Sequence, residues 1–168
     1  MLCANCGAEN IEGVDQCEAC GQSMQRDRSH LSAIEKSMLK DRISDLDPRE
    51  VLTVAPTASV KEVLNLLVDN RVGCVVIAES GIPVGIFSER DVLVKLGNSP
   101  AEFEDKPISD YMTTNPETLE SSAKIAFAVH QMDMGHYRHL PIVDQTGVVT
   151  GIISVRDILR YLNEKIAS

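Results

Sequence analysis

Large aromatic side chains are scarce in this sequence, which has no tryptophan and only three phenylalanines and three tyrosines among 168 residues. Its core must therefore be built mainly from aliphatic side chains. No apolar run approaches the roughly 18 residues that a membrane-spanning helix needs, so we expect no membrane partner. The first residues carry neither a basic flank nor an apolar stretch and do not resemble a secretory signal. We expect a soluble, cytoplasmic protein.

Basic residues are also in the minority. Sixteen Lys and Arg face 25 Asp and Glu, which gives a formal net charge of −9. Because such a body repels phosphate at long range, general binding to nucleic acid or to an anionic membrane is not expected. Apolar residues make up 43% and charged residues 24% of the chain, so a packed core is feasible and global disorder is excluded.

Four of the five cysteines fall within the first twenty residues, as the pairs Cys3–Cys6 and Cys17–Cys20. A glycine follows each pair and lets the backbone turn beneath the two sulfurs. Four thiolates can close a tetrahedron around Zn²⁺ and leave no open position, which predicts a structural and not a catalytic metal. A segment of about 25 residues cannot bury enough apolar surface alone. Zinc binding could supply on the order of 10 kcal/mol.

Disulfide bonding and redox chemistry are two other uses of these cysteines. A pair of disulfides would suit a small secreted protein, but the remainder of the chain is large and poor in cysteine. A redox-active Cys-x-x-Cys pair is disfavoured because two such pairs occur, each with its glycine. The segment resembles short zinc ribbons of microbial proteins in its letters Cys-Ala-Asn-Cys-Gly-Ala-Glu-Asn. Residues 1–25 contain no Lys or Arg, which favours protein docking or a purely structural role over phosphate contact.

Residues 25–42 follow as a polar linker. Leu31, Ile34, Met38 and Leu39 recur at helical spacing and predict one amphipathic helix over this range. Its apolar stripe could pack on the main body or on a second copy of the chain.

The rest of the chain is a repeat. Residues 84–93 match residues 150–159 at an offset of 66, and residues 43–45 match residues 108–110 at an offset of 65. We therefore divide the chain into a ribbon at 1–24, the linker helix at 25–42, and two repeat units at 43–100 and 106–166.

Each unit predicts the order β-α-β-β-α. In the first we expect strands at 51–54, 74–78 and 84–87, with helices at 60–70 and 88–96. The second predicts a strand near Thr118, a helix from Ser121 to about Met134, strands at 140–143 and 148–153, and a helix from Ser154. The expected fold class is therefore a mixed one, α/β (α+β), built of two βαββα units.

The motif Gly-h-h-Ser-x-Arg-Asp, where h is hydrophobic, closes the third strand of both units at residues 85–91 and 151–157. With His-Leu-Pro-Ile-Val-Asp at 139–144, it resembles a tandem pair of CBS domains, or Bateman module, over residues 43–166. The first unit departs from the pattern at residues 73–78. The resemblance implies pseudo-two-fold symmetry, two clefts for adenosine-containing ligands, no catalytic machinery of its own, and a homodimer formed through helices.

The chemistry of the repeated motif agrees with such a ligand. Ser88 and Ser154 stand where a strand passes into a helix and can donate to a phosphate. Arg90 and Arg156 add positive charge, and the carboxylates of Asp91 and Asp157 can accept both hydrogens of a ribose diol. The alternative is a plain helix-capping box, in which the helix dipole favours Asp by about 0.3–1 kcal/mol. Two copies in register favour the ligand.

The family geometry implies two unequal clefts. One combines Ser88, Arg90 and Asp91 with the second unit's Met112, Pro116, Glu117, Arg138 and His139, with His136 a further candidate. The other combines Ser154, Arg156 and Asp157 with Val51, Leu52, Gly73 and Cys74. Because the first has the richer basic set, we expect it to prefer the phosphorylated ligand. Cys74 itself lies in an apolar run and is expected to be buried rather than reactive.

These observations predict a regulatory protein that senses AMP, ADP, ATP, NAD(H) or S-adenosylmethionine and contains structural zinc. No nucleophile–base pair is evident, so an enzyme is not expected. The ligand state would pass to an unidentified protein partner through the zinc ribbon or the dimer surface. The alternatives are a ribbon that docks protein or RNA, with the CBS pair as dimerising scaffold, and a purely structural protein with degenerate clefts.

Overall fold

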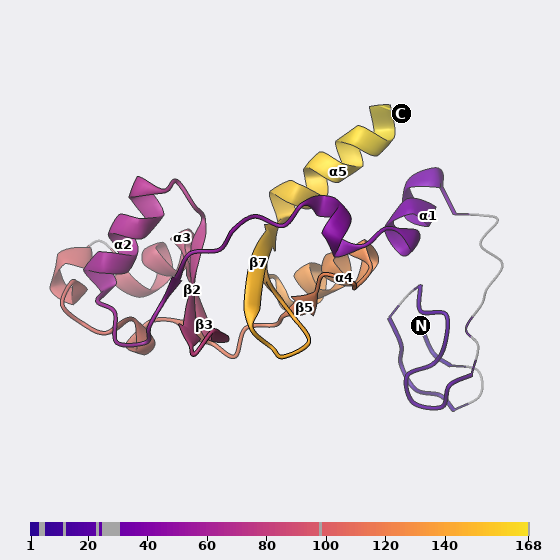
Figure 1. Ribbon diagram of the computed structural model, residues 1–168, viewed down its shortest axis with the longest axis horizontal. Coiled ribbons are helices and arrows are strands. Elements are labelled where there is room, and N and C mark those ends of the chain that lie inside the picture. The colour runs from indigo at the N-terminus through magenta and orange to yellow at the C-terminus, as the bar shows by residue number, and fades with distance from the viewer. Residues whose placement is uncertain (4–5, 12, 23, 25–30, 98, 168) are drawn as a thin grey trace. The chain divides into compact units, whose positions relative to one another are not determined.

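The computed structural model describes residues 1–3, 6–11, 13–22, 24, 31–97 and 99–167 (Figure 1). The chain forms two compact units. One comprises Met1–Asp47, Ser122–Arg138 and Ser154–Ser168, and the other comprises Pro48–Ser121 and His139–Ile153. In the described part of the chain, no helix has the length and apolar character needed to cross a bilayer.

A four-stranded sheet with the order β1-β2-β3-β4 contains the three strands of the first repeat and one short strand, β4, from the start of the second (Figure 1). Strand β1 (Thr53–Val54) runs parallel to β2 (Cys74–Glu79), which is antiparallel to β3 (Ile82–Ser88), and β4 (Thr113–Thr114) adds to β3. The two turn residues between β2 and β3 have positive φ, as tight hairpins require. The first four residues of β2 are buried, as their apolar run predicts.

Helix α2 (Val60–Asp69) covers this sheet (Figure 1). It begins at Ser59, whose hydroxyl accepts a hydrogen bond from the Glu62 N–H at 3.1 Å. Its apolar side forms one core with the sheet and the segments that follow it, made of Val60, Val63, Leu67, Val75, Ile77, Phe87, Leu96 and Ile108. Each such side chain contributes roughly 1.5–3 kcal/mol on burial.

The second helix of the first repeat is less regular than the sequence predicts. After one turn, α3 (Glu89–Asp91), the backbone widens into a π-helical stretch at Val92–Leu96 and ends at Gly97. Short 3-10 turns follow at Pro100–Phe103 and Ile108–Asp110, and another lies at Ile43–Leu46.

The second repeat has a three-stranded sheet with the order β5-β6-β7, made of Leu119–Glu120, His139–Val143 and Val149–Ser154. Helix α4 spans Ile125–Gly135, and α5 spans Val155–Ala167. The predicted start of α4 at Ser121 is wrong. The Ala123 carbonyl accepts from the Ile43 N–H at 2.8 Å, and the Ile125 N–H donates to the Asp41 carbonyl at 3.1 Å. This pairing holds the segment extended and delays the helix.

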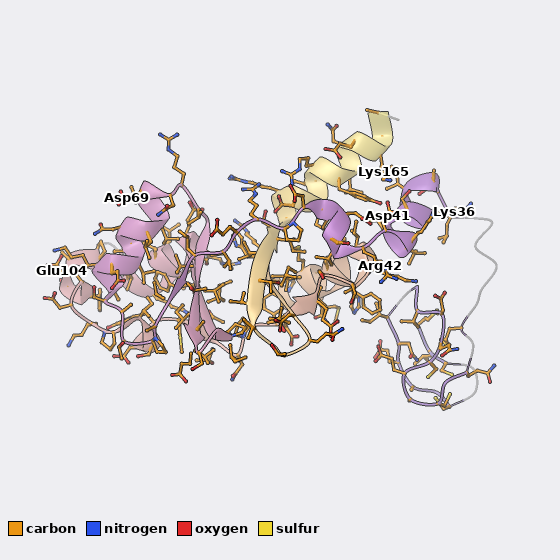
Figure 2. All side chains as sticks on the ribbon, viewed as in Figure 1. Lys36, Asp41, Arg42, Asp69, Glu104 and Lys165 are labelled. Carbon is orange, nitrogen blue, oxygen red and sulfur yellow. The ribbon has the colours of Figure 1, made fainter. Side chains whose placement is uncertain are left out.

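Helix α1 (Ala33–Lys40) lies in the predicted linker but covers less of it. A capping box between Ser32 and Glu35 starts it, and residues 25–30 of the predicted helix lie outside the described residues. At its end, Asp41 accepts from the Tyr161 hydroxyl and from Lys165 Nζ of α5, both at 2.9 Å. Asp41 and Lys165 are labelled in Figure 2. The Lys165 hydrogen bond holds the pKa of Asp41 below its ordinary value, while burial and Asp41 raise the pKa of Tyr161 to about 12.

The βαββα order thus appears twice, and the predicted mixed α/β fold class is confirmed.

Candidate functional site

The four N-terminal cysteines converge on one point. Their Sγ atoms all lie within 4.8 Å of one another, with 3.7 Å between Cys3 and Cys20 and 3.6 Å between Cys6 and Cys17. A zinc–sulfur bond of about 2.3 Å sets the edges of a tetrahedral site at about 3.8 Å. All four are free thiols, and these separations are far above the roughly 2.05 Å of a disulfide. The donor set therefore fits a closed zinc site.

Two turns of the same design present these sulfurs. The Gly7 N–H donates to the Cys3 carbonyl at 2.9 Å, and the Gly21 N–H donates to the Cys17 carbonyl at 2.8 Å. Both glycines have positive φ, of 72° and 68°, which other residues adopt at a cost. The glycine after each cysteine pair thus has the turn-forming role that the sequence predicts.

Asn10 supports the cysteines from behind and was not predicted. It is 6% exposed, and its Nδ2 donates to the Ala8 carbonyl at 2.9 Å and to Cys17 Sγ at 3.4 Å. Its Oδ1 accepts from the Glu18 N–H at 3.0 Å. Burial disfavours the Cys17 thiolate, but hydrogen bonds from Asn10 and nearby backbone outweigh it and lower the pKa of Cys17 to about 6. These hydrogen bonds to the sulfur favour the thiolate, which is the form that binds zinc.

The first repeated corner lies where β3 passes into α3. Ser88 donates to Asp91 Oδ2 through its N–H at 2.8 Å and through its hydroxyl at 2.6 Å, which is the capping arrangement. The other carboxylate oxygen, Oδ1, faces Lys95 Nζ at 2.8 Å and the Thr113 hydroxyl at 3.3 Å. Partial burial would raise the pKa of Asp91, but hydrogen bonds from Lys95 and Ser88 outweigh it and hold the pKa below its ordinary value.

The neighbours of this corner come from β2 and β6. Cys74 stands opposite Ser88 in the β2–β3 register, and the Glu89 N–H donates to the Gly73 carbonyl at 3.1 Å. His139 packs against Gly73 so closely that a Cβ there would lie 2.8 Å from its Nε2. Cys74 is buried as predicted, and burial with the charges of Asp91 and Glu89 raises its pKa to about 12. It is therefore an inert thiol.

The second corner repeats the serine–aspartate geometry with a different cation. Asp157 Oδ2 accepts from the Ser154 N–H at 2.8 Å and from its hydroxyl at 2.7 Å. Its Oδ1 is bound by Arg160 NH2 at 3.0 Å, and the same nitrogen reaches the Leu46 carbonyl at 3.4 Å. The side chain of Asp157 is 3% exposed, against 15% for Asp91. The second carboxylate is thus the more enclosed.

A family model for the CBS domain matches residues 43–98 and again residues 108–164. The chain belongs to the CBS-domain family. An uncharacterised 17.7 kDa protein of Acidianus ambivalens is 29% identical over 122 residues, which are 72% of this chain and 73% of that one. A CBS domain-containing protein of Arabidopsis thaliana is 27% identical over 88% of this chain, which spans only 27% of the plant protein.

Among solved structures, a CBS domain protein from Pyrobaculum aerophilum complexed with AMP is similar to this chain. It is 28% identical with a TM-score of 0.66, over 76% of this chain and 98% of the other. Residues 1–42, which hold the cysteine cluster and α1, lie outside both matched CBS ranges.

One compact unit contains most residues predicted for the first cleft of the CBS pair. Arg90 and Glu117 are exposed, Pro116 is half-buried, and Met112 packs against Gly85 on β3. Arg138 and His136, both exposed, belong to the other unit. For the second cleft, Ser154, exposed Arg156 and Asp157 belong to one unit, while half-buried Val51 and Leu52, with Gly73 and Cys74, belong to the other.

Three partners of the corner carboxylates were missed by the sequence interpretation. Lys95 and Arg160 lie four and three residues beyond their aspartates, and this helical spacing was a usable indication. Thr113 reaches Asp91 from β4, a strand that the sequence did not predict, and nothing in the local sequence indicates that contact.

Proposed function

We propose that this CBS pair is a regulatory module that senses an adenosine-containing ligand, with AMP as the first candidate, at the corner of Ser88, Arg90 and Asp91. The observation that carries the proposal is the ionised Asp91 carboxylate, held by Ser88 on one oxygen and flanked by Lys95 on the other. The AMP complex of the similar Pyrobaculum aerophilum protein supports the choice of ligand.

The corner has the groups that a ribose phosphate needs. Asp91 Oδ1 can accept from a ribose hydroxyl in place of Thr113, whose hydrogen bond is long at 3.3 Å. Arg90 is exposed on the adjoining turn, so its guanidinium can approach a phosphate. Lys95 is held by Asp91, the Tyr111 carbonyl and Thr113, and adds positive charge beside the carboxylate. Inside a chain of net charge −9, such a local cationic spot favours a small anion over a polymeric one.

We propose that the second corner binds the ligand weakly or not at all. A cation holds Oδ1 at both corners, Lys95 at the first and Arg160 at the second, but Asp157 is 3% exposed against 15% for Asp91. A ligand at the second corner would have to displace a charge-assisted hydrogen bond from the more buried carboxylate, which costs about 1.5–3 kcal/mol. The richer basic surroundings of the first corner then decide where the phosphorylated ligand binds.

We further propose that the four cysteines hold one structural zinc ion and that the chain acts as a cytoplasmic homodimer without catalytic activity. Ligand binding would favour one arrangement of the two CBS units and shift its population. That state would pass to a protein partner through the dimer surface or the ribbon.

A scaffold function is the second candidate, and one observation favours it. Both corner serines already donate to their own aspartates, as in plain helix caps. In that case the CBS pair would only dimerise, and the ribbon would dock a protein or an RNA.

Isothermal titration of the zinc-loaded protein with AMP, ADP, ATP, NAD⁺ and S-adenosylmethionine tests the proposal. Arg90→Ala and Arg156→Ala form a matched pair, since both side chains are exposed and neither substitution breaks a cap. We expect AMP to bind, and we expect Arg90→Ala to lower the affinity for AMP by about 10-fold or more, because it removes a charge-assisted hydrogen bond. Arg156→Ala should leave that affinity nearly unchanged. No heat with any ligand, from a folded dimer, would favour the scaffold. Equal losses in both variants would refute the preference for the first corner.

A further inference from the structure

The ribbon packs on the helices of its own chain. Its small core consists of four buried residues, Cys3, Val14, Cys17 and Met24, and Phe127 of α4 packs against it. Phe127 belongs to the second CBS match, far from the ribbon in sequence. Phe127 is partly buried, and its aromatic ring adds apolar contact to a core that has only these four buried residues.

Two more contacts join the ribbon to this part of the chain. Lys124, which precedes α4, lies 3.2 Å from the carboxylate of Asp15, and this pair is partly exposed. Gly13 approaches α1 so closely that a Cβ would overlap Cδ2 of Leu39. The ribbon is therefore held by an apolar contact, an ion pair and a close backbone approach, from two different helices.

Zinc and this docking depend on the same residues. Cys3 and Cys17 are two of the four zinc ligands and also two of the four core residues, each 2% exposed. A ribbon without metal would leave four thiols at the centre of a segment that cannot fold alone. The surface against which Phe127 packs therefore exists only while the ligands are gathered.

The docked helices also contact α5. Asp41, which caps α1, binds Tyr161 and Lys165 of α5 (Figure 2). The Val155 N–H, at the start of α5, donates to the Arg138 carbonyl at 3.0 Å, shortly after α4 ends. Helix α5 carries the second corner at its first turn.

We infer that the ribbon packs on α1 and α4 only when it holds zinc, an arrangement that we call the zinc clamp. Metal occupancy then controls the packing of the helices of the second CBS unit. The ribbon's partner is its own chain, and the clamp makes the protein responsive to zinc availability. This inference does not depend on nucleotide binding at the first corner. By reciprocity, residues that dock the ribbon must also raise its affinity for zinc.

Hydrogen exchange of the full-length reduced protein, with and without zinc, tests the clamp. Removing zinc with a chelator should speed exchange in α4 and leave α2 unchanged, because α2 lies in the first repeat and serves as an internal control. Faster exchange confined to the ribbon, with α4 unaffected, would overturn the inference. Loss of AMP binding alone would bear on the nucleotide proposal and not on this one.

Variants test the reciprocal effect on zinc affinity, measured by competition with a chromophoric chelator. Phe127→Ala should lower the affinity for zinc by about 5- to 150-fold, which is the usual range of coupling between two sites. Phe103→Ala is the matched control, since Phe103 packs on the core of the first repeat and should leave zinc affinity unchanged. If Phe127→Ala folds poorly, the ion pair offers a second test. Asp15→Lys should lower the zinc affinity, and the double variant Asp15→Lys/Lys124→Asp should restore it. Equal zinc affinity in all the folded variants would refute the clamp.

Discussion

Replacing Asn10 by alanine is the sharpest test of how the zinc ribbon is built. The change removes three hydrogen bonds, to the Ala8 carbonyl, to Cys17 Sγ and from the Glu18 N–H. At about 0.5–1.5 kcal/mol each, these bonds are worth about 1.5–4.5 kcal/mol together. Groups that orient metal ligands usually change affinity by about 10- to 100-fold, which is consistent with the lower part of that range. We therefore expect Asn10→Ala to lower the zinc affinity by about 10- to 100-fold.

The measurement is chelator competition on the reduced protein, with far-ultraviolet circular dichroism to verify that the CBS pair remains folded. Asn70→Ala is the matched control, because Asn70 is exposed at the end of α2 and its amide only donates to the Leu66 carbonyl. The control should bind zinc like the unaltered protein. Zinc affinity within about twofold of wild type in folded Asn10→Ala would refute the view that this amide orients Cys17.

Three further predictions concern the corners. The pKa of Asp91 in the folded protein lies below its value of about 3.9 in the unfolded chain. The ionised carboxylate therefore stabilises the fold above that pH, and this stabilisation is lost as the pH falls through the lower, folded-state pKa. In an acid titration, Asp91→Asn should lose less stability than the unaltered protein. Gly73→Ala should displace the His139 ring and lower the affinity for AMP several-fold, measured by calorimetric titration. Its melting temperature, measured by thermal unfolding, should stay nearly unchanged. Arg160→Ala should uncover Asp157 and raise the AMP stoichiometry measured by calorimetry; an unchanged value would show that Arg160 does not close the second corner.

Secondary structure was predictable wherever the pattern is local. The apolar run at 74–77 predicted a buried strand, the helix expected at 60–70 is α2, and the repeat predicted the order βαββα twice, as the structure has them. The start of α4 was not predictable, because residues 123–125 pair with the backbone at 41–43, far away in sequence. The π-helical stretch Val92–Leu96 has no indication in side-chain periodicity, which distinguishes π from α spacing poorly over five residues.

Parts of the candidate site were predictable to the same extent. The serine–aspartate pairs and the cysteine cluster follow from spacing alone, and the structure brings each set together. Asn10 was not singled out, because a buried polar residue in a short loop looks like any turn residue until its partners are known. Docking of the ribbon on Phe127 and Leu39 depends on tertiary packing, which sequence spacing does not reveal.

The two corners show how a duplicated motif can diverge through residues outside it. Both keep serine and aspartate three residues apart, and both aspartates accept the same two hydrogen bonds from their serine. What differs is the cation one helical turn later. Both cations also donate to a backbone carbonyl, Lys95 to Tyr111 and Arg160 to Leu46. The carboxylate beside the lysine is 15% exposed, whereas the one beside the arginine is 3% exposed. If the first corner binds the ligand as proposed, the preference between the corners would then depend on a position that the repeated motif does not contain.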